Sequence, residues 1–484
     1  MTKQKQSNGW ATEELEHLDL GDKRLNERLT KICDSFSECP ESPINQSCED
    51  WAETKAAYRF FKNENVDVRD IRTAHRLKTA ARAKKYKTVL AIQDSSYFIY
   101  TGHPKTEGLG RMSLKKGKNV EKIFSNGLIM HACLAVTTDG TPLGLLDQQI
   151  FARELRTAEQ RKLVDVTPVE KKESYRWLQS LKNSKEVSSD TQVVTVCDRE
   201  ADFYEFFKLS DEIKSPVLVR ANVNRAVNKS SRYTEKSVVK LWDYMAKQPK
   251  AGTITVELPS KRKTQHCKER AARSAILTIK HGSFLLNPPR NNIKHRSAEL
   301  SDLLMHAVYV FEAKPPEGED PVEWMLLTNL SVTNFSEAHE KVLWYCLRWR
   351  IEMYFKVLKS GFLVENCRLG NADRLIKYLT VMSIVAWRLF MVTLISRANP
   401  DTPCTELIAE HEWKVLFMKV NKAKCLPKKT PSIGAVVIWI ARLGGFLARK
   451  GDGMPGTITL WRGWKRLTDL TDGWNLALNG GTCG

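Results

Sequence analysis

Apolar residues recur at helical spacing through roughly the first ninety residues, which predicts a helical region. Three candidate N-caps divide it. Asp22, after Gly21, precedes a helix over residues 23–36, Ser47 opens a second helix ending near residue 63, and Asp67 opens a third running to residue 86. Residues 66–88 hold eight Lys or Arg against two Asp. The third segment is therefore either a solvated basic helix or a helix that contacts phosphates.

After residue 87 the hydrophobic pattern becomes strand-like. A short apolar strand at residues 87–97 runs into Asp94, and residues 127–149 form a hairpin pattern with Asp139–Gly140 as its turn. A helical segment around residues 174–181 precedes a second buried strand, at residues 191–203, which contains Asp198. This order of strands and helix resembles a ribonuclease-H-like α/β core.

Five more strand patterns, separated by Pro, Gly and basic loops, lie between about residues 215 and 335. The stretch from Arg220 to Arg273 holds fourteen Lys or Arg against four acids. Beyond about residue 375 the pattern returns to helices, with a basic loop at residues 421–431. We therefore predict a multidomain α/β fold, in which a ribonuclease-H-like catalytic core is interrupted by a β-rich insertion and flanked by helical N- and C-terminal domains.

Polar side chains between residues 345 and 359 fall on one stripe of a predicted helix, within roughly 80° of arc. The members of this stripe are Tyr345, Arg348, Glu352, Lys356 and Lys359. The adjoining flank is apolar and suited to packing, with Trp344, Leu347, Ile351, Phe355 and Leu358. Such a stripe is either a solvated face joined by i,i+4 ion pairs or a set of groups that holds a metal ion and a phosphodiester.

Two further acids occupy positions where active sites form in open α/β sheets. Asp94 closes one apolar run and Asp198 closes another, so both carboxylates are expected at the same edge of a sheet. Together with Glu352 they would supply three carboxylates for two hard cations. Two such ions activate a water or a 3'-hydroxyl and stabilise the leaving oxygen of an in-line displacement.

The charge of the chain indicates that this α/β protein binds a nucleic acid. A formal charge of +20 and a pI near 9.4 indicate a polyanionic ligand. With 484 residues, 42% of them hydrophobic, the chain is long enough for several domains. The polar first ten residues predict no signal peptide, and the apolar stretch from Leu379 to Ile395, interrupted by Arg388, predicts a buried core helix with no membrane partner.

The cysteines predict a reducing compartment. The chain has eleven of them, scattered, with no C-x-x-C pair, so neither a zinc site nor a disulfide framework is indicated. A cytoplasmic, nucleoid-associated bacterial location is expected.

These motifs resemble the DDE transposases of the IS-four family. The resemblance rests on the order Asp94, Asp198, Glu352, on the strings CDREAD and WRIE, and on the spacing Y-x2-R-x3-E-x6-K that begins at Tyr345. It extends over nearly the whole chain, through LGDKR at 20–24, AYRF at 57–60 and RLGGF at 442–446. Around residues 47–56 only the shape of the family pattern remains, so the end sequence recognised is expected to be this element's own.

The resemblance implies a cut-and-paste transposase that nicks the transferred strand, forms and reopens a hairpin, and joins transposon ends to target DNA as a homodimer in a synaptic complex. Asp94, Asp198 and Glu352 would bind two Mg²⁺ ions, with Mn²⁺ as a substitute. The residues expected to contact double-stranded DNA are Tyr345, Arg348, Lys356, Lys359, Trp324, Arg220, Arg225, Lys23, Arg24 and Arg28. Among these, Trp324 would lodge near a flipped base during hairpin formation.

The predicted boundaries are 1–75 for the helical end-binding domain, 76–375 for the catalytic core with its insertion at about 215–335, and 376–484 for the helical dimerisation domain. Two other functions fit part of the pattern. A catalytically retired regulator would keep the basic surfaces but has little need of the three acids, Tyr345, Arg348 and Lys359. A structure-specific nuclease of the same superfamily fits the acids but not the resemblance along the whole chain.

Overall fold

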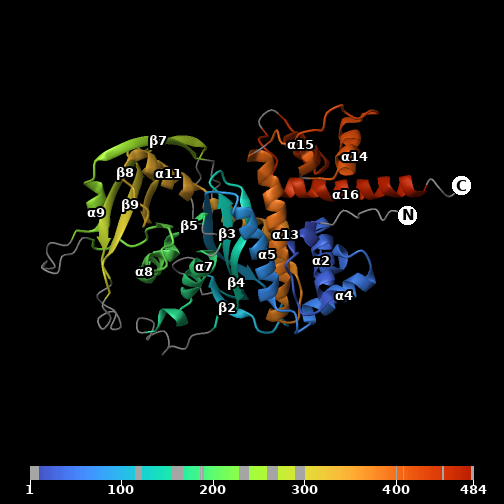
Figure 1. Ribbon diagram of the computed structural model, residues 1–484, viewed down its shortest axis with the longest axis horizontal. Helices are drawn as coiled ribbons and strands as arrows, with labels where there is room; N and C mark the ends of the chain where they lie inside the picture. The colour runs from blue at the N-terminus through green and yellow to red at the C-terminus, as the bar shows by residue number, and fades with distance from the viewer. Residues whose placement is uncertain are drawn as a thin grey trace. The chain divides into compact units, whose positions relative to one another are not determined.

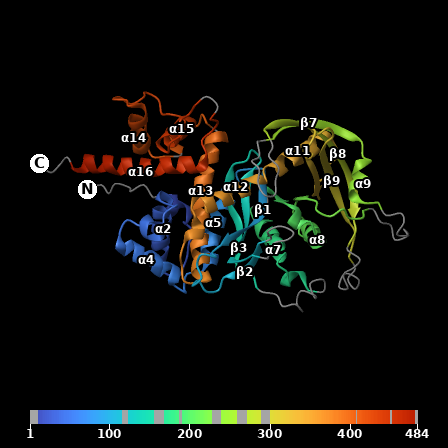
Figure 2. The same ribbon diagram turned by 180° about the vertical axis from the view of Figure 1, so that it is seen from behind.

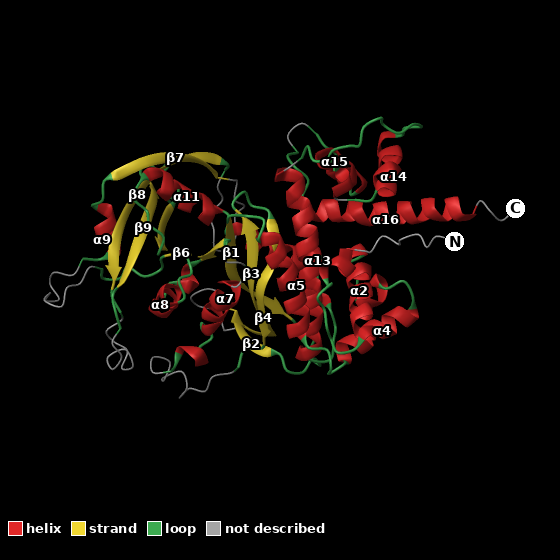
Figure 3. Cartoon of the chain, in the orientation of Figure 1, coloured by secondary structure: helices red, strands yellow, loops and turns green. Residues whose placement is uncertain are grey.

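The computed structural model describes residues 10–114, 123–154, 167–185, 187, 190–227, 239–258, 271–288, 300–398, 400–406, 408–449 and 452–480. The chain divides into two compact units. The first combines Met1–Lys85, Ser95–Leu155 and Arg350–Gly484, and the second combines Tyr86–Asp94 and Arg156–Trp349. Figure 1 follows the chain by colour, and Figure 3 shows that helices and strands are mixed along it. The mixed α/β class predicted from the sequence is confirmed.

Helices form the N-terminal part of the first unit: α1 (Trp10–Glu14), α2 (Lys23–Glu38), α3 (Ile44–Ser47), α4 (Trp51–Lys62) and α5 (Val68–Ala83). The side chain of Asp22 accepts the N–H of Arg24, and that of Asp67 accepts the N–H of Arg69, so both predicted caps are confirmed. The prediction that Ser47 opens a helix is wrong. Asp50 caps α4 by accepting the N–H of Glu53, and the Ser47 hydroxyl instead donates to the carbonyl of Cys39.

An antiparallel set of strands follows in the first unit, made of β2 (Gly110–Leu114), β3 (Ile123–Thr137) and β4 (Pro142–Phe151), with β3 between the other two. The predicted hairpin turn is confirmed, because Gly140 joins β3 to β4 with a φ of +97°. At the start of β4, α5 approaches so closely that a Cβ on Gly144 would lie 2.0 Å from Oγ1 of Thr79. Only glycine permits this packing of helix on strand.

A buried ionic network ties α1, α5 and β4 together. Glu14 accepts hydrogen bonds from both terminal nitrogens of Arg82, at 2.7 and 3.0 Å, and its Oε1 lies 2.6 Å from Nδ1 of His75. The N–H of Leu145 donates to the other ring nitrogen of His75, so Nδ1 carries the proton and donates it to Glu14. Burial raises the pKa of Glu14, but the bonds from His75 and Arg82 outweigh this and bring the pKa to about 2.

The C-terminal part of the first unit is helical, as predicted. It contains α12 (Trp349–Lys356), the π-helical turn η4 (Val357–Gly361), η5 (Val364–Asn366), α13 (Ala372–Ala398), η6 (Cys404–Glu406), α14 (Glu410–Asn421), α15 (Ile433–Leu443) and α16 (Thr457–Gly480). Figure 2 shows α12 and α13 from behind. By length and composition α13 could cross a membrane, but 83% of its most apolar window is buried, as in the core helix that was predicted.

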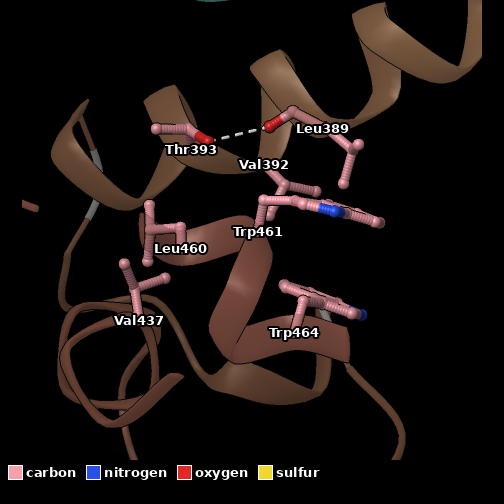
Figure 4. Close-up of a pocket in the computed structure, with 7 residues that line it drawn as sticks. All are labelled: Leu389, Val392, Thr393, Val437, Leu460, Trp461 and Trp464. Atoms are coloured by element: carbon pink, nitrogen blue, oxygen red, sulfur yellow. Dashed lines mark hydrogen bonds between the residues drawn. The ribbon is translucent and has the colours of Figure 1, made fainter. Parts of the chain in front are cut away.

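Helices α13, α15 and α16 enclose a narrow apolar pocket (Figure 4). Its walls are Leu389, Val392, Thr393, Val437, Leu460, Trp461 and Trp464. The Thr393 hydroxyl donates to the carbonyl of Leu389 at 2.9 Å, and the buried indole nitrogen of Trp461 has no hydrogen-bond partner among the described residues. The other side chains of the wall are mainly apolar, as expected for the packing of these helices.

The second unit is built on strands. Its elements are η1 (Val169–Lys171), α7 (Tyr175–Lys185), β5 (Gln192–Cys197), η2 (Arg199–Ala201), α8 (Tyr204–Glu212), β6 (Val217–Arg220), α9 (Leu241–Ala246), β7 (Lys250–Leu258), β8 (Arg273–Leu286), β9 (Leu303–Glu312), β10 (Glu323–Thr328) and α11 (Phe335–Cys346). β5 pairs in parallel with β1 (Thr88–Ile99) on one side and with β6 on the other. From β6 the order continues through antiparallel β10, β9, β8 and β7.

All five strand patterns predicted between residues 215 and 335 are therefore confirmed. Helices α7, α8 and α9 contribute to a core with one face of these strands, in which Trp177, Phe206, Phe207 and Phe284 are buried. Residues 228–238 and 259–270, which carry much of the basic stretch predicted from Arg220 to Arg273, lie outside the described residues.

Candidate active site

Asp94 and Asp198 are level with each other on neighbouring parallel strands. The register between β1 and β5 runs from Thr88 opposite Gln192 to Ile92 opposite Val196, and two further residues along each chain lead to Asp94 and Asp198. Residues two apart on a strand share a face. Asp94 and Asp198 therefore lie at matching positions on the two segments of chain, each two residues beyond the paired segment. The expectation that both acids belong to one sheet edge is supported.

The position of Asp94 within its strand differs from the prediction. Asp94 was expected to close a short strand, yet β1 continues to Ile99. The reason is a second partner: the later half of β1 neighbours β3 in the first unit, and the N–H of Tyr100 donates to the carbonyl of Asn126 there at 2.8 Å. Asp94 therefore lies just past the segment of β1 that pairs with β5, and Asp198 lies one residue after β5 ends.

Arg348 forms an ion pair with Asp94, in which Nη1 of Arg348 lies 3.3 Å from Oδ2 of Asp94. The side chain of Arg348 is 10% exposed and that of Asp94 is 18% exposed, so this ion pair is mostly shielded from water. The guanidinium also lies 5.9 Å from the ring of Tyr345 and 5.5 Å from that of Trp349. A cation held in this way places positive charge directly beside the acidic pair.

Tyr345 interacts with two further residues of the second unit. Its ring centroid lies 5.8 Å from that of Trp324, and its hydroxyl interacts electrostatically with the guanidinium of Arg220. Arg220 also donates to the carbonyl of Glu323 at 3.0 Å. Burial raises the pKa of Tyr345, the charges of Arg348 and Arg220 lower it, and Asp198 raises it. Burial also lowers the pKa of Arg220. Four of the sequence-predicted residues of this unit, Tyr345, Arg348, Arg220 and Trp324, thus form one cluster.

The single helix predicted over residues 345–359 is wrong. α11 ends at Cys346 and α12 begins at Trp349. Between them, the N–H groups of Leu347 and Arg348 donate to carbonyls three residues back, at Trp344 and Tyr345. Three-residue turns rotate the chain by about 120° per residue instead of 100°, which breaks the stripe. No Gly or Pro between residues 335 and 360 marks this break in the sequence.

A second departure from α-helical geometry follows α12. In η4 the N–H of Phe362 donates to the carbonyl of Val357, five residues back. This π-helical turn carries Lys359, whose Nζ lies 5.2 Å from the ring of Phe98. Burial lowers the pKa of Lys359, and Glu365 raises it. π-helical turns are frequent at functional sites.

Glu352, Lys356 and Lys359 all belong to the first unit. Glu352 is half-buried on α12, and Lys356 is exposed. The apolar flank predicted beside them is confirmed, because Ile351, Phe355 and Leu358 are buried. Lys23, Arg24 and Arg28, also in this unit, lie along α2, where Lys23 and Arg24 are exposed and Lys23 pairs with Glu27 at 3.7 Å.

Arg225 is held by an acid that the sequence analysis did not single out. Its guanidinium pairs with Asp202, whose side chain is fully buried. Asp202 also accepts the N–H groups of Asn222 and Val223, at 2.6 and 3.0 Å. The signal for this role was weak, since Asp202 looks in sequence like one more acid of the CDREAD string. It anchors the loop that follows β6 and carries Arg225.

The turn between Asp198 and Asp202 is braced from α7. Arg176, nearly buried, donates to Glu200 at 2.8 Å and to Glu173 at 3.3 Å. Burial raises the pKa of Glu200, and Arg176 lowers it. Arg199 was also not predicted. It is exposed next to Asp198 and its charge acts on Arg220.

Comparison with protein families accounts for nearly the whole chain. A family described as Transposase DNA-binding matches residues 7–66, one described as Transposase DDE domain matches residues 66–387, and one described as Transposase Tn5 dimerisation domain matches residues 384–481. The match to the DDE family places the chain among enzymes that cut and join DNA strands, and the mixed α/β fold is compatible with this class. The chain belongs to the DDE transposases, and its three matched parts make it Tn5-like.

DNA and a second copy of the chain are the partners that the matched DNA-binding and dimerisation domains indicate. DDE transposase domains depend on a divalent metal ion. The level carboxylates of Asp94 and Asp198 fit such an ion, because hard divalent cations prefer carboxylate oxygens. Within the described ranges, no group of three or more His, Cys, Asp or Glu side chains is gathered as a metal site.

Proposed function

We propose that this transposase works by cut-and-paste. It binds the transposon ends, nicks each to free a 3'-hydroxyl, forms and resolves a hairpin, and joins the ends to target DNA, with two protomers in one synaptic complex. It acts in the bacterial cytoplasm on nucleoid DNA. The match to DNA-binding, DDE and dimerisation families in this order supports the proposal.

Asp94, Asp198 and Glu352 are the catalytic carboxylates of this proposal, holding two Mg²⁺ ions or, in substitution, Mn²⁺. When bound, such ions activate the attacking oxygen and stabilise the leaving oxygen of a phosphodiester. The observation that supports the assignment is that Asp94 and Asp198 occupy matching positions just beyond the paired segment of β1 and β5, with Arg348 beside Asp94. Glu352 follows four residues after Arg348 on the next helix.

The cations and rings around Tyr345 would hold the scissile strand. Arg348, Tyr345 and Arg220 bind phosphate oxygens. Trp324, whose ring lies 5.8 Å from that of Tyr345 and is tilted from it by 59°, supports a base that leaves the helix when the hairpin forms. Arg225 contacts end DNA with the guanidinium donors that Asp202 does not engage. Lys356 and Lys359 add positive charge next to Glu352 along the chain, and Lys23, Arg24 and Arg28 on α2 contact the end sequence.

The domain scheme of the sequence analysis is part of the proposal: end binding by residues 1–75, a ribonuclease-H-like core at 76–375 with an insertion at about 215–335, and dimerisation by residues 376–484. With these bounds, strands β1, β3, β4 and β5 would belong to the core and strands β6 to β10 to the insertion.

The decisive experiment replaces each acid separately. Asp94→Ala, Asp198→Ala and Glu352→Ala are each expected to abolish Mg²⁺-dependent nicking of end DNA and to leave end binding largely intact, since binding depends on distant phosphate contacts. Gel-shift affinity and nicking are measured on the same end DNA. Near-normal nicking by any one of the three variants would remove that residue from the catalytic set.

A further inference from the structure

A basic surface in the region matched to the dimerisation family has no role in the reaction so far. Between Glu412 and Asp452 the chain contains no Asp or Glu but nine Lys or Arg. Five of the lysines fall within eleven residues, at the end of α14 and in the loop to α15. We call these the lysine loop: Lys419, Lys422, Lys424, Lys428 and Lys429.

The ammonium groups of the lysine loop are open to solvent. All five residues are exposed, and none of them forms an ion pair with a carboxylate of the described chain. By contrast, Lys414, earlier on the same helix, forms an ion pair with Glu410 at 2.6 Å. Like charges collected at one place without acids destabilise a fold slightly through mutual repulsion, so their presence points to an anionic partner.

The loop is nevertheless fixed at both ends. Lys422 ends α14 in a left-handed conformation, with a φ of +51°. At the other end, the carbonyl of Pro431 accepts the N–H of Cys404 at 2.9 Å, the N–H of Ile433 donates to Thr402 at 2.7 Å, and Ser432 caps α15. The lysines therefore stand on a folded support instead of a free tail.

Helix stabilisation explains only part of this charge. A lysine in the last turn of a helix favours the negative end of its dipole by about 0.3–1 kcal/mol, within that turn only. Lys419 and Lys422 are placed for this effect at the end of α14. Lys424, Lys428 and Lys429 lie past it, and Lys428 and Lys429 precede the start of α15, where the dipole disfavours cations. Their charge is unexplained by the fold.

We propose that the lysine loop binds the phosphate backbone of target duplex DNA. The assignment to target DNA follows from the side chains: lysine is a mobile point charge that neutralises phosphates without reading bases. Transposon ends must be distinguished by sequence, whereas a target is held without such readout. This inference rests on the proposed joining of ends to target DNA, and it adds a DNA-binding role to a region whose family description names only dimerisation.

The test uses the full-length protein with Lys422, Lys424, Lys428 and Lys429 all changed to Gln. The matched control changes four exposed lysines of the second unit to Gln, Lys171, Lys182, Lys247 and Lys314, and so removes the same charge. Affinity for a duplex lacking the end sequence is measured from low to high salt. Each lost phosphate contact should reduce the slope of log K against log salt by about 0.9.

The lysine-loop variant is expected to lose a slope of about 2–4 and at least tenfold in joining pre-cleaved ends to a plasmid, with end binding and nicking unchanged. The control should change neither quantity as much. Equal losses in both variants, or an unchanged slope, would overturn the proposal. A parallel loss of end affinity would assign the loop to the ends, and a loss of the dimer in light scattering would assign it to the protomer contact.

Failure of this inference is distinguishable from failure of the proposed function. If the unaltered protein nicks ends but never joins them to a plasmid, the cut-and-paste proposal itself is wrong. If it joins them and the lysine-loop variant joins them equally well, only the role of the loop is wrong.

Discussion

Asp198 and Asp202 stand at the two ends of one short turn, η2, in opposite surroundings. Asp202 is fully buried and accepts two backbone N–H groups and a guanidinium. Asp198 is half-exposed, and in the described chain its carboxylate accepts one hydrogen bond, from the N–H of Glu200 at 2.9 Å. The first has its oxygens occupied by the protein, and the second keeps them available.

This difference separates a structural carboxylate, Asp202, from the proposed catalytic carboxylate, Asp198, within a single motif. A carboxylate that binds a metal ion or substrate needs lone pairs that the protein does not use, whereas a buried carboxylate must have them satisfied to offset its desolvation. Glu14 in the first unit repeats the structural case, with bonds from His75 and Arg82. Like Asp198, Asp94 is partly exposed to solvent, with 18% of its side chain accessible.

The largest expected effect on stability comes from Asp202→Ala. It leaves the buried guanidinium of Arg225 and the N–H groups of Asn222 and Val223 without their acceptor, which should lower the free energy of unfolding by about 3–5 kcal/mol. Urea denaturation measures this. Asp198→Ala is the matched control and should lower stability by only about 1 kcal/mol, since it removes a single capping hydrogen bond. Equal destabilisation by the two substitutions would contradict the conclusion that Asp202 stabilises the fold more than Asp198 does.

Arg348→Ala should lower nicking by about 10- to 100-fold, because it removes the cation that pairs with Asp94 and that is proposed to bind a phosphate oxygen. Circular dichroism should show the helices intact. Arg348→Lys, which keeps a charge but not the planar fork, should recover part of the rate. The control is Lys208→Ala, which removes an exposed partner of Glu212 on α8. A large loss of thermal stability with unchanged chemistry in the folded fraction would instead make Arg348 a structural ion-pair residue.

Trp324→Ala is expected to separate two steps of the reaction. Stacking of a base on an aromatic ring contributes about 1–3 kcal/mol, so its loss should slow hairpin formation by roughly 5- to 150-fold. The first hydrolytic nick needs no flipped base and should slow less. Denaturing gels resolve the two products. If both slow equally and the melting temperature falls, Trp324 serves only to pack against Tyr345.

The β elements of this chain were predictable because their signals are local. Alternating patterns identified β6 to β10, and Asp139–Gly140 identified the turn between β3 and β4. The N-caps of α2 and α5 followed from single residues, Asp22 and Asp67. Ser47 was misleading because Ser47 and Asp50 are both residue types that favour the N-cap position. Only the folded backbone decides which of them reaches the free N–H groups at the start of α4.

The path from Tyr345 to Lys359 was not predictable in the same way. Its apolar flank was identified correctly, since burial of every third or fourth residue is needed whether the turns are tight or wide. The change to three-residue turns at Leu347 and Arg348, and to a five-residue turn after Val357, leaves no mark in residue type. These changes arise from packing on remote segments, which a repeating pattern does not record.

By itself the sequence determined which acids, cations and rings are available, the strands on which Asp94 and Asp198 lie, and the class of chemistry they suit. Tertiary structure decided which carboxylates keep oxygens that the protein does not use. The fold brings Arg225 and backbone N–H groups about twenty residues away to Asp202, where they occupy its oxygens. Pairing of β1 with β5 also brings Asp198 to a position matching that of Asp94, more than a hundred residues earlier in the chain. The physical reason is that helix caps and strand alternation depend on neighbours within a few positions. Satisfaction of a buried carboxylate depends on whichever donors the fold brings to it.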